Sequence, residues 1–298
     1  MQQLPPSRIA AVHDLSCVGR CALTVILPTL SVMGYQTVPI PTALLSSHTG
    51  GFEDLHFRDL TEDMHGIIDH FGRLALSFRA IYTGFLGSEA QIRTVEELID
   101  RFEGVPDESG KPPLILVDPV MGDDGALYST YTPALAEGMR ALCHRAHVLT
   151  PNLTEACLLT DIPYVDPRTQ EEAAREEMIE TLLSRLSVYG APRVVITGIE
   201  HADGCVENVG LDADDTRFSV KRMRRGVSYP GTGDLFACVL LGTLLDGEKF
   251  SRAVERAADF VGDVIEASSA VNSPVRMGVS LEPHLKHLIK TEEGRRSL

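Results

Sequence analysis

The chain has 298 residues, of which 44% are hydrophobic, and its formal net charge is −15 at pH 7. Such a negative charge argues against a nucleic-acid-binding surface, which needs basic stripes. No apolar run reaches the roughly 20 residues that a membrane-spanning helix needs. The length is common for one large α/β domain and no composition shift marks a boundary. We therefore expect a single domain over residues 1–298, with neither nucleic acid nor a membrane as partner.

The cysteine pattern and the N-terminal residues indicate the cellular compartment in which we expect the protein. The six cysteines, at positions 17, 21, 143, 157, 205 and 238, form no CxxC pair, and no second ligand pair follows Cys17 and Cys21. A zinc site is therefore not expected, and reduced thiols fit a cytosol. The segment Met1–Pro6 has no basic region leading into an apolar stretch, so no secretory signal is expected. We predict a cytoplasmic protein.

Short runs rich in aliphatic residues recur along the chain and predict strands. They are continuous rather than alternating, which is typical of parallel strands buried on both faces. In chain order they are Ile9–His13, Thr37–Ile40, Ile81–Thr83, Leu114–Val117, Val148–Leu149 and Val194–Ile196.

Helical patterns separate these runs. Apolar residues at spacings of three and four predict helices over residues 60–76, 95–102 and 250–265. The acidic stretch 161–180 is interpreted as a loop and a solvated helix face, and 104–113 as a surface connection. Alternating strands and helices predict an α/β fold with a mostly parallel sheet covered by helices on both faces.

Each predicted strand is followed by a polar or turn residue. Ligands of open α/β sheets bind beyond the carboxyl ends of the strands. We therefore expect these residues to share one crevice. They are Asp14, Gly84, Asp118, Asn152, Thr197 and Gly198.

A glycine-rich turn precedes an apolar segment in the C-terminal half. Gly231-Thr232-Gly233-Asp234 is followed by the run 235–241, which we interpret as a buried helix. The glycines allow close approach of the backbone to a ligand, and the positive end of a helix attracts an anion. Asp234 is placed to accept a proton from a hydroxyl that attacks a phosphoryl group, and the dipole favours its ionised form. The alternative is a capped helix in which Asp234 only complements the dipole.

Two further clusters could carry chemistry. Asp118 opens a glycine-punctuated loop that suits cation or phosphate chemistry, although an aspartate before proline also starts ordinary turns. Asp123 and Asp124 in this loop are interpreted as solvated. Asn152 and Glu155 fit a capping box at a helix start. The functional alternative makes Glu155 an organiser of magnesium and its waters.

Polar loops are expected at residues 13–20 and 46–52, each after a predicted strand. They offer hydrogen-bond partners for a small polar heterocycle, but His13 and His48 could equally be ordinary turn residues. Neither histidine has the spacing of a metal ligand. The pattern GxxxxGK[ST] is absent, and no GxGxxG follows the first predicted strand. The sequence therefore argues against a P-loop ATPase and a standard dinucleotide-binding domain.

The three motifs that begin at Asp118, Asn152 and Gly231 occur in this order along the chain. Their order and separation resemble the ribokinase-like superfamily over nearly the whole chain. The resemblance implies a three-layer α/β sandwich with a mostly parallel central sheet and helices on both faces.

Within this superfamily, the N-terminal stretch, Ser47-His48-Thr49, residues 84–87 and the Leu127-Tyr128 loop look most like pyridoxal kinases. The resemblance implies ATP-dependent phosphorylation of the 5′-hydroxymethyl group of pyridoxal, pyridoxine or pyridoxamine, in salvage of pyridoxal 5′-phosphate. It implies magnesium as cofactor, a small pyridine-type substrate and a homodimer, and it leaves a monovalent cation open as a further ligand.

Residue roles follow from the same resemblance. Asp234 matches the catalytic base, and the amides of Gly231, Thr232 and Gly233 match the anion hole. The nucleotide side comprises Asp118, Asn152, Glu155, Thr197 and Gly198, with Asp118 and Glu155 at the magnesium. The substrate side comprises Asp14, His48, Thr49, Phe85 and the closing-loop residue Tyr128.

The chain departs from the pattern mainly on the substrate side. Asp14 stands where many pyridoxal kinases have serine, Gly50 replaces a common glutamine or tyrosine, and Phe85 replaces a frequent tyrosine. These departures bear on the substrate more than on the reaction. A hydroxymethylpyrimidine kinase or another ribokinase-like small-molecule kinase is the alternative, and a non-catalytic vitamer-binding protein is a second one.

Overall fold

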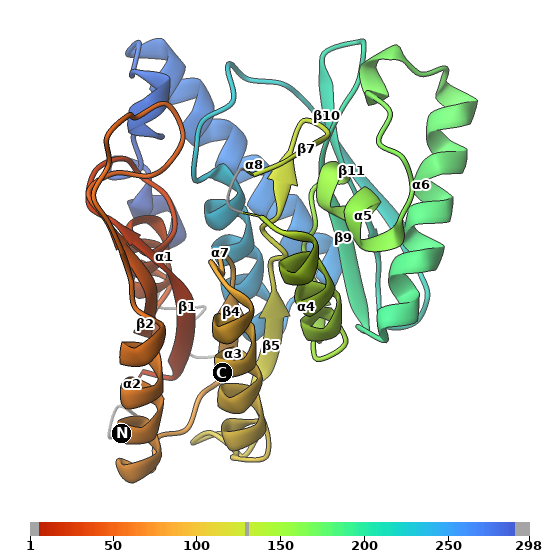
Figure 1. Cartoon of the computed structure of the whole chain (residues 1–298). Coiled ribbons are helices and arrows are strands. Elements are labelled where there is room, and N and C mark those ends of the chain that lie inside the picture. The colour runs from red at the N-terminus through yellow and green to blue at the C-terminus, as the bar shows by residue number, and fades with distance from the viewer. Residues whose placement is uncertain (1–5, 129–130, 290–298) are drawn as a thin grey trace.

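A twisted sheet runs through the centre of the molecule (Figure 1). The computed structural model describes residues 6–128 and 131–289. Across the sheet the strand order is β3-β2-β1-β4-β5-β8-β9-β10-β11. Their bounds are β1 (Arg8–Ser16), β2 (Gln36–Leu45), β3 (Phe57–Asp59), β4 (Ala80–Thr83), β5 (Leu114–Val117), β8 (Val148–Leu149), β9 (Arg193–Glu200), β10 (Cys205–Leu211) and β11 (Arg217–Met223). A small separate hairpin joins β6 (Gly122–Asp123) and β7 (Ala126–Leu127).

The six predicted strands form the parallel centre of this sheet. β2, β1, β4, β5, β8 and β9 pair in parallel from one neighbour to the next. The edges differ from the prediction, because β3 adds to β2 and the β10–β11 hairpin adds to β9 in antiparallel fashion. The mostly parallel α/β sheet is confirmed, and the edge strands are the additions that the sequence did not predict.

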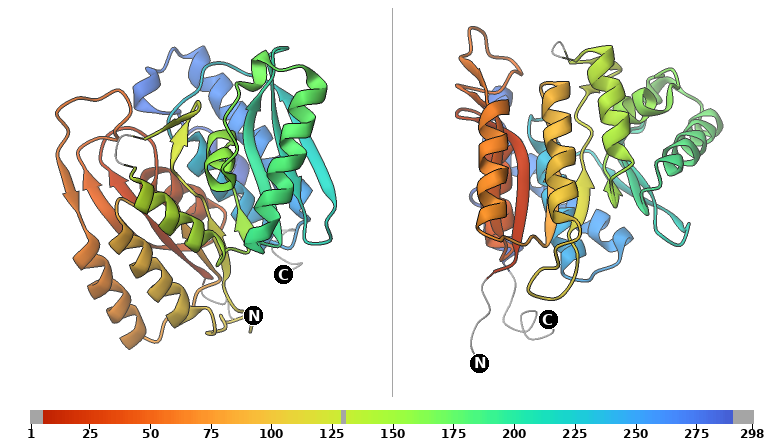
Figure 2. Two further views of the ribbon diagram at one scale, coloured as in Figure 1. Left: turned by 45° about the vertical axis from the view of Figure 1, so that its right-hand side comes forward. Right: turned by 60° about the horizontal axis from the view of Figure 1, so that its bottom comes forward.

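Helices cover both faces of the sheet (Figure 2). One face carries α2 (Thr61–Arg73), α3 (Glu89–Phe102), α4 (Pro133–Cys143), α5 (Leu153–Thr160) and α6 (Glu172–Leu186), and the other carries α1 (Leu23–Val32), α7 (Thr232–Leu245) and α8 (Phe250–Ala270). Each face has its own apolar core, so the sheet is buried between two layers. The helices predicted over 95–102 and 250–265 lie within α3 and α8, the one predicted over 60–76 extends beyond both ends of α2, and the expected buried helix after the glycine turn is α7. No helix of the described ranges is long and apolar enough to cross a membrane.

Local sequence explains where several helices begin. The Ser88 hydroxyl accepts a hydrogen bond from the Gln91 N–H at the start of α3, and Thr132 does the same for Leu135 at the start of α4. α7 has no such side-chain cap, and ten of its fourteen residues are buried between α1, α8 and the sheet. Its uncapped N-terminus therefore keeps N–H groups available at the end of the sheet.

Candidate active site

A cavity of about 840 Å³ lies at the carboxyl ends of the parallel strands. Every residue that the sequence assigned to the site lies on its wall, whatever role it was given. These residues are Asp14, His48, Thr49, Phe85, Asp118, Tyr128, Asn152, Glu155, Thr197, Gly198, Gly231, Thr232, Gly233 and Asp234. The shared crevice is therefore confirmed for these positions, and their individual roles stay predictions. Gly84, which was also expected there, does not line the cavity and instead leaves room for the ring of His13.

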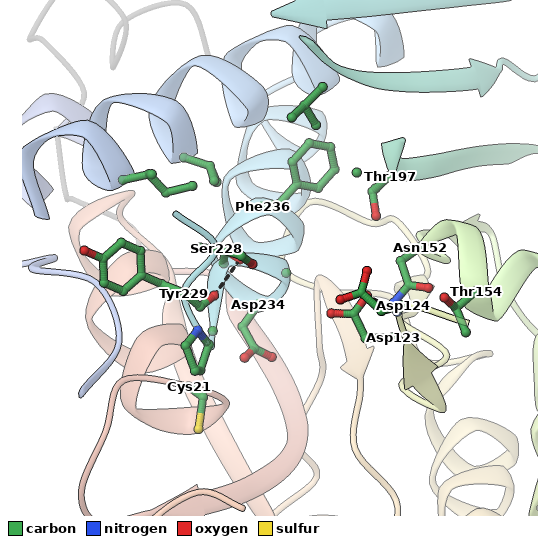
Figure 3. A pocket seen from close by; sticks show the side chains of 18 of the residues that line it. Cys21, Asp123, Asp124, Asn152, Thr154, Thr197, Ser228, Tyr229, Asp234 and Phe236 are labelled. Carbon is green, nitrogen blue, oxygen red and sulfur yellow. Dashed lines mark hydrogen bonds between the residues drawn. The ribbon is translucent and has the colours of Figure 1, made fainter. Parts of the chain in front are cut away.

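The glycine turn is built by two different kinds of glycine. Gly231 has φ of 80°, and a Cβ there would collide with the carbonyl oxygen of Arg20, so both its conformation and its surroundings require glycine. A Cβ at Gly233 would meet no atom within 4 Å, so the fold itself does not demand glycine there. The Thr232 hydroxyl donates to the Tyr229 carbonyl oxygen at 2.9 Å and fixes the turn (Figure 3).

Asp234 points from the first turn of α7 into the cavity (Figure 3). The Ala22 N–H donates to its Oδ2 at 2.7 Å. Burial, opposed by the Ala22 N–H and aided by the charge of Asp14, raises the pKa of Asp234 to about 7. The sequence predicted that the helix dipole favours the ionised form. In this cavity burial outweighs that effect, and the carboxyl titrates near neutral pH.

Asp118 and Glu155 form a pair of buried acidic side chains in another part of the cavity. Asp118 directly follows β5 and is buried, and burial together with the charge of Asp234 raises its pKa to about 8. Burial and the nearby Asp118 also raise the pKa of Glu155 well above its usual range. Within the described ranges, no lysine or arginine forms an ion pair with either carboxylate. Two unpaired buried carboxylates suit a bound cation.

Asn152 and Glu155 also form the predicted capping box. Glu155 Oε2 accepts from the Asn152 N–H at 2.8 Å, and Asn152 Oδ1 accepts from the Glu155 N–H at 2.9 Å. The remaining groups tie down the Asp118 loop, because Glu155 Oε1 accepts from the Met121 N–H and Asn152 Nδ2 donates to the Gly122 carbonyl. The structural reading of this motif is thus confirmed. Its role toward magnesium stays a prediction.

The opposite end of the cavity is formed by the end of β1 and the segment after β2. β1 continues to Ser16, so the predicted polar loop from residue 13 is wrong at its start. The register between β1 and β2 shifts around Asp14, where β2 holds one extra residue. The Ser16 hydroxyl donates to Asp14 Oδ2 at 2.8 Å, and burial raises the pKa of Asp14.

His48 lines this end but has no free ring nitrogen. Its Nδ1 accepts from the Gly50 N–H at 3.0 Å, so Nε2 carries the proton and donates to the Arg276 carbonyl oxygen at 2.6 Å. The expectation that His48 offers a hydrogen bond to a heterocycle therefore needs correction. The side chain anchors the loop to residue 276 and presents its ring to the cavity.

The sequence missed most of the wall around the other end. An apolar strip there is formed by Val206 of β10, Phe236 of α7, and Val261 and Ile265 of α8. Residues 222–230 complete it and are held to α8 and β9 by the Arg222–Asp259 and Arg224–Glu200 ion pairs. The helical spacing of residues 250–265 signalled burial, but nothing in it distinguished a cavity wall from core.

The β6–β7 hairpin forms the rim over the acidic pair. Asp123 and Asp124 are exposed, as the interpretation of solvated loop residues requires, and both also point to the cavity from this hairpin (Figure 3). The Gly125 N–H donates to the Thr154 hydroxyl at 2.9 Å and attaches the hairpin to α5. Tyr128, 42% exposed, stands at the end of the rim, next to positions outside the described ranges.

Comparison with known proteins agrees with this arrangement. Residues 11–277 match the family model of phosphomethylpyrimidine kinase. The chain belongs to the phosphomethylpyrimidine kinase family. A pyridoxine/pyridoxal/pyridoxamine kinase of Bordetella avium is 30% identical over 92% of this chain and 90% of that protein. A hydroxymethylpyrimidine/phosphomethylpyrimidine kinase of Mycobacterium tuberculosis is 25% identical over 89% of this chain and 90% of that protein.

Solved structures show the same fold. A proposed phosphomethylpyrimidine kinase of Bacteroides thetaiotaomicron, in a crystal form with pyridoxal, has a TM-score of 0.86 and 38% identity over 95% of this chain and 96% of that one. Pyridoxal kinase of Lactobacillus plantarum has a TM-score of 0.83 and 30% identity over 95% and 96%. The resemblance to pyridoxal kinases of the ribokinase-like fold is confirmed, and this member of the family is a kinase.

Asp118 should make the stability of this kinase depend on pH. Its pKa of about 8 exceeds the ordinary carboxyl value, so the folded state keeps a proton that the unfolded state loses above roughly pH 4. The free energy of unfolding therefore falls as pH rises through this window, by up to about 1.4 kcal/mol per pH unit. Asp118→Asn should flatten the fall of Tm between roughly pH 5 and 8 in ligand-free protein, measured by scanning calorimetry.

The exposed control Glu248→Gln should retain the wild-type slope. Parallel Tm curves for the wild type and Asp118→Asn would show that Asp118 does not titrate in this range.

Proposed function

We propose that this kinase transfers the γ-phosphoryl group of Mg-ATP to the 5′-hydroxymethyl group of a vitamin B6 vitamer. The observation that carries the proposal is Asp234, a carboxylate held by the Ala22 N–H at the N-terminus of α7 and directed into the cavity. The pKa of about 7 suits a general base at neutral pH. The similarity to the Bordetella kinase and to the Bacteroides protein with pyridoxal supports a pyridine substrate.

In this proposal the two ends of the cavity bind different substrates, and Asp234 lies between them. Asp234 accepts the proton of the substrate hydroxyl, the hydroxyl oxygen attacks the γ-phosphorus of ATP, and the bond from that phosphorus to the β–γ bridging oxygen breaks so that ADP leaves. The N–H groups of residues 231–233 and the positive end of α7 receive the negative charge of the transferring group. The apolar strip of Phe236, Val261 and Ile265 suits a flat base of a nucleotide, and the Asp14 end suits the vitamer.

Magnesium fits the acidic pair. Asp118 and Glu155 are buried oxygen donors without a cationic partner in the described ranges, and magnesium needs few direct carboxylates because it keeps several waters. No group of three or more His, Cys, Asp or Glu in the described ranges could hold a metal by itself. When bound with ATP, magnesium would neutralise phosphate charge. Asp118 would contact it, and Glu155 would mainly hold the loop that places Asp118.

Hydroxymethylpyrimidine is the second candidate substrate. The Mycobacterium relative covers nearly the same share of the chain as the Bordetella relative, at lower identity. Both rings carry a primary alcohol, so the reaction is common to them and the choice depends on the Asp14 end. A binding protein without activity is less consistent with Asp234, because a buried carboxylate at a helix start is costly without a use. A cytoplasmic homodimer remains our expectation.

Asp234→Asn tests the reaction itself. The amide cannot accept the proton, so kcat for pyridoxal should fall by roughly 10²–10⁴ while ATP affinity stays near the wild-type value. Coupled ADP release measures kcat, and calorimetric titration measures ATP binding. Turnover close to the wild type would remove Asp234 from the mechanism and leave the binding-protein alternative in place.

Gly233→Ala tests the anion turn with an internal control. A methyl group at Gly233 meets no protein atom, so Tm should not fall, whereas kcat should fall because the methyl occupies the phosphate side of the turn. Gly231→Ala should lower both Tm and kcat, since φ is 80° and the Arg20 carbonyl leaves no room. A Gly233→Ala enzyme with full activity would show that phosphate does not approach this amide.

Asp14→Ser tests vitamer choice. A buried carboxylate bound only by Ser16 among the described contacts favours a cationic substrate group through a charge-assisted hydrogen bond. The variant should therefore lower kcat/KM for pyridoxamine about tenfold more than for pyridoxine. Ser16→Ala, which keeps the carboxylate, is the matched control. An equal loss for all vitamers would mean that Asp14 contacts the shared ring, and no loss would place it outside the substrate contact.

A further inference from the structure

His13 is a buried polar side chain without a hydrogen-bond partner, directly behind Asp234. It lies on β1 and is fully buried, and neither ring nitrogen makes a hydrogen bond in the described structure. Its Nδ1 lies 3.8 Å from Asp234 Oδ1, just beyond hydrogen-bond length. Buried polar groups are nearly always paired, so an unpaired imidazole at this place calls for a cause.

The imidazole is fixed in place by its surroundings. The ring packs edge-on against Tyr82 of β4, with 4.3 Å between the ring centres. On another side, a Cβ at Gly84 would collide with the ring, so glycine at that position leaves the space which the imidazole occupies. Packing of this kind would suit an apolar side chain equally well. The nitrogen near Asp234 is therefore the feature that packing does not explain.

The chemistry of the two groups is complementary. Burial lowers the pKa of His13 to about 3, so the ring is neutral and carries one N–H. Asp234 must be ionised to accept a proton, and it is then an acceptor only. The Ala22 N–H already occupies Oδ2, and it is the one hydrogen bond that Asp234 receives among the described residues. Oδ1, the oxygen nearest His13, has none.

Other titratable groups around the base do not supply this donor. Asp14 and Asp118 are acidic. The charge of Asp14 raises the pKa of Asp234, and the charge of Asp234 raises the pKa of Asp118. Cys21 and Cys238 feel its charge, but neither thiol forms a hydrogen bond with it in the described structure. The same holds for the hydroxyl groups of Tyr82 and Tyr128.

We propose that His13 is a positioning residue for phosphoryl transfer, in which Nδ1–H donates to Oδ1 of the ionised Asp234. With Ala22 on Oδ2, the carboxylate is then held at both oxygens, and its remaining lone pairs face the substrate hydroxyl. A closure of under 1 Å from the observed 3.8 Å, roughly what a side-chain torsion supplies, forms the hydrogen bond. The proposal rests on the proposed role of Asp234 as base.

A matched pair of variants tests it. In His13→Asn an amide replaces the part of the ring that bears Nδ1, whereas His13→Leu has nearly the same shape and no donor. His13→Leu should lower kcat for pyridoxal with Mg-ATP by about 10- to 100-fold with KM little changed, the loss expected for one hydrogen bond to a charged group. His13→Asn should retain most of the activity. Equal losses in the two variants would overturn the proposal.

A double-mutant cycle separates this role from a general effect on folding. In an Asp234→Asn background, His13→Leu should cause no further loss, because its effect passes through the carboxylate. The same additional factor in both backgrounds would overturn the proposal while leaving Asp234 as base. If Asp234→Asn alone keeps full activity, the proposed function fails first, and the His13 proposal fails with it.

Two further variants guard against a folding artefact. Gly84→Ala keeps the imidazole but displaces its ring, so it should reproduce the kcat loss of His13→Leu even if that variant folds poorly. Ile9→Val, on the same buried strand but outside the cavity wall, should lower Tm without changing kcat. Wild-type kcat for Gly84→Ala, with the protein folded, would overturn the proposal.

Discussion

Acidic side chains are buried at one end of this sheet with no lysine or arginine of the described ranges paired to them, and much of the local structure follows from holding them there. Asp234, Asp118 and Glu155 all have raised pKa values, and in each case the loss of water is the largest cause. Backbone N–H groups rather than arginines or lysines hold Asp234 and Glu155. An amide stabilises a carboxylate without neutralising it, so the site keeps its capacity for a cation and for a transferable proton.

This arrangement joins segments that are far apart in sequence. The amide that holds Asp234 belongs to Ala22, 212 positions earlier, which caps α1 with φ of 46° and ψ of −133°. Residues with a side chain rarely adopt such values, and the cost is on the order of 1–3 kcal/mol. Packing of α1 against α7 maintains the conformation. The strain is thus placed where it directs an N–H at Asp234, the residue that we propose as the base, and strained backbone is common at functional sites.

The sequence predicted the parts of the fold that depend on one strong local signal. Continuous apolar runs marked the six parallel strands, because most of these strands are buried on both faces, although β2 is exposed or half-buried up to Pro39. β11, Arg217–Met223, mixes polar and apolar residues at an exposed edge and gave no comparable run. The cavity residues at strand ends were predictable too, because each directly follows one of these apolar runs. The wall made by residues 222–230 was not, because it depends on tertiary ion pairs to α8 and β9.

The two roles that we propose for His13 and Asp14, one in the reaction and one in specificity, fall on adjacent residues of one strand. The predicted strand ends at His13 and Asp14 was assigned to the loop after it, yet β1 continues to Ser16, and adjacent residues of a strand point to opposite sides. His13 therefore faces the core behind Asp234, while Asp14 faces the cavity. A shift of β1 changes both positions together, because they share one backbone. Under the proposed mechanism, substrate preference can therefore change at Asp14 while the α7 turn stays the same, provided that His13 keeps Asp234 in place.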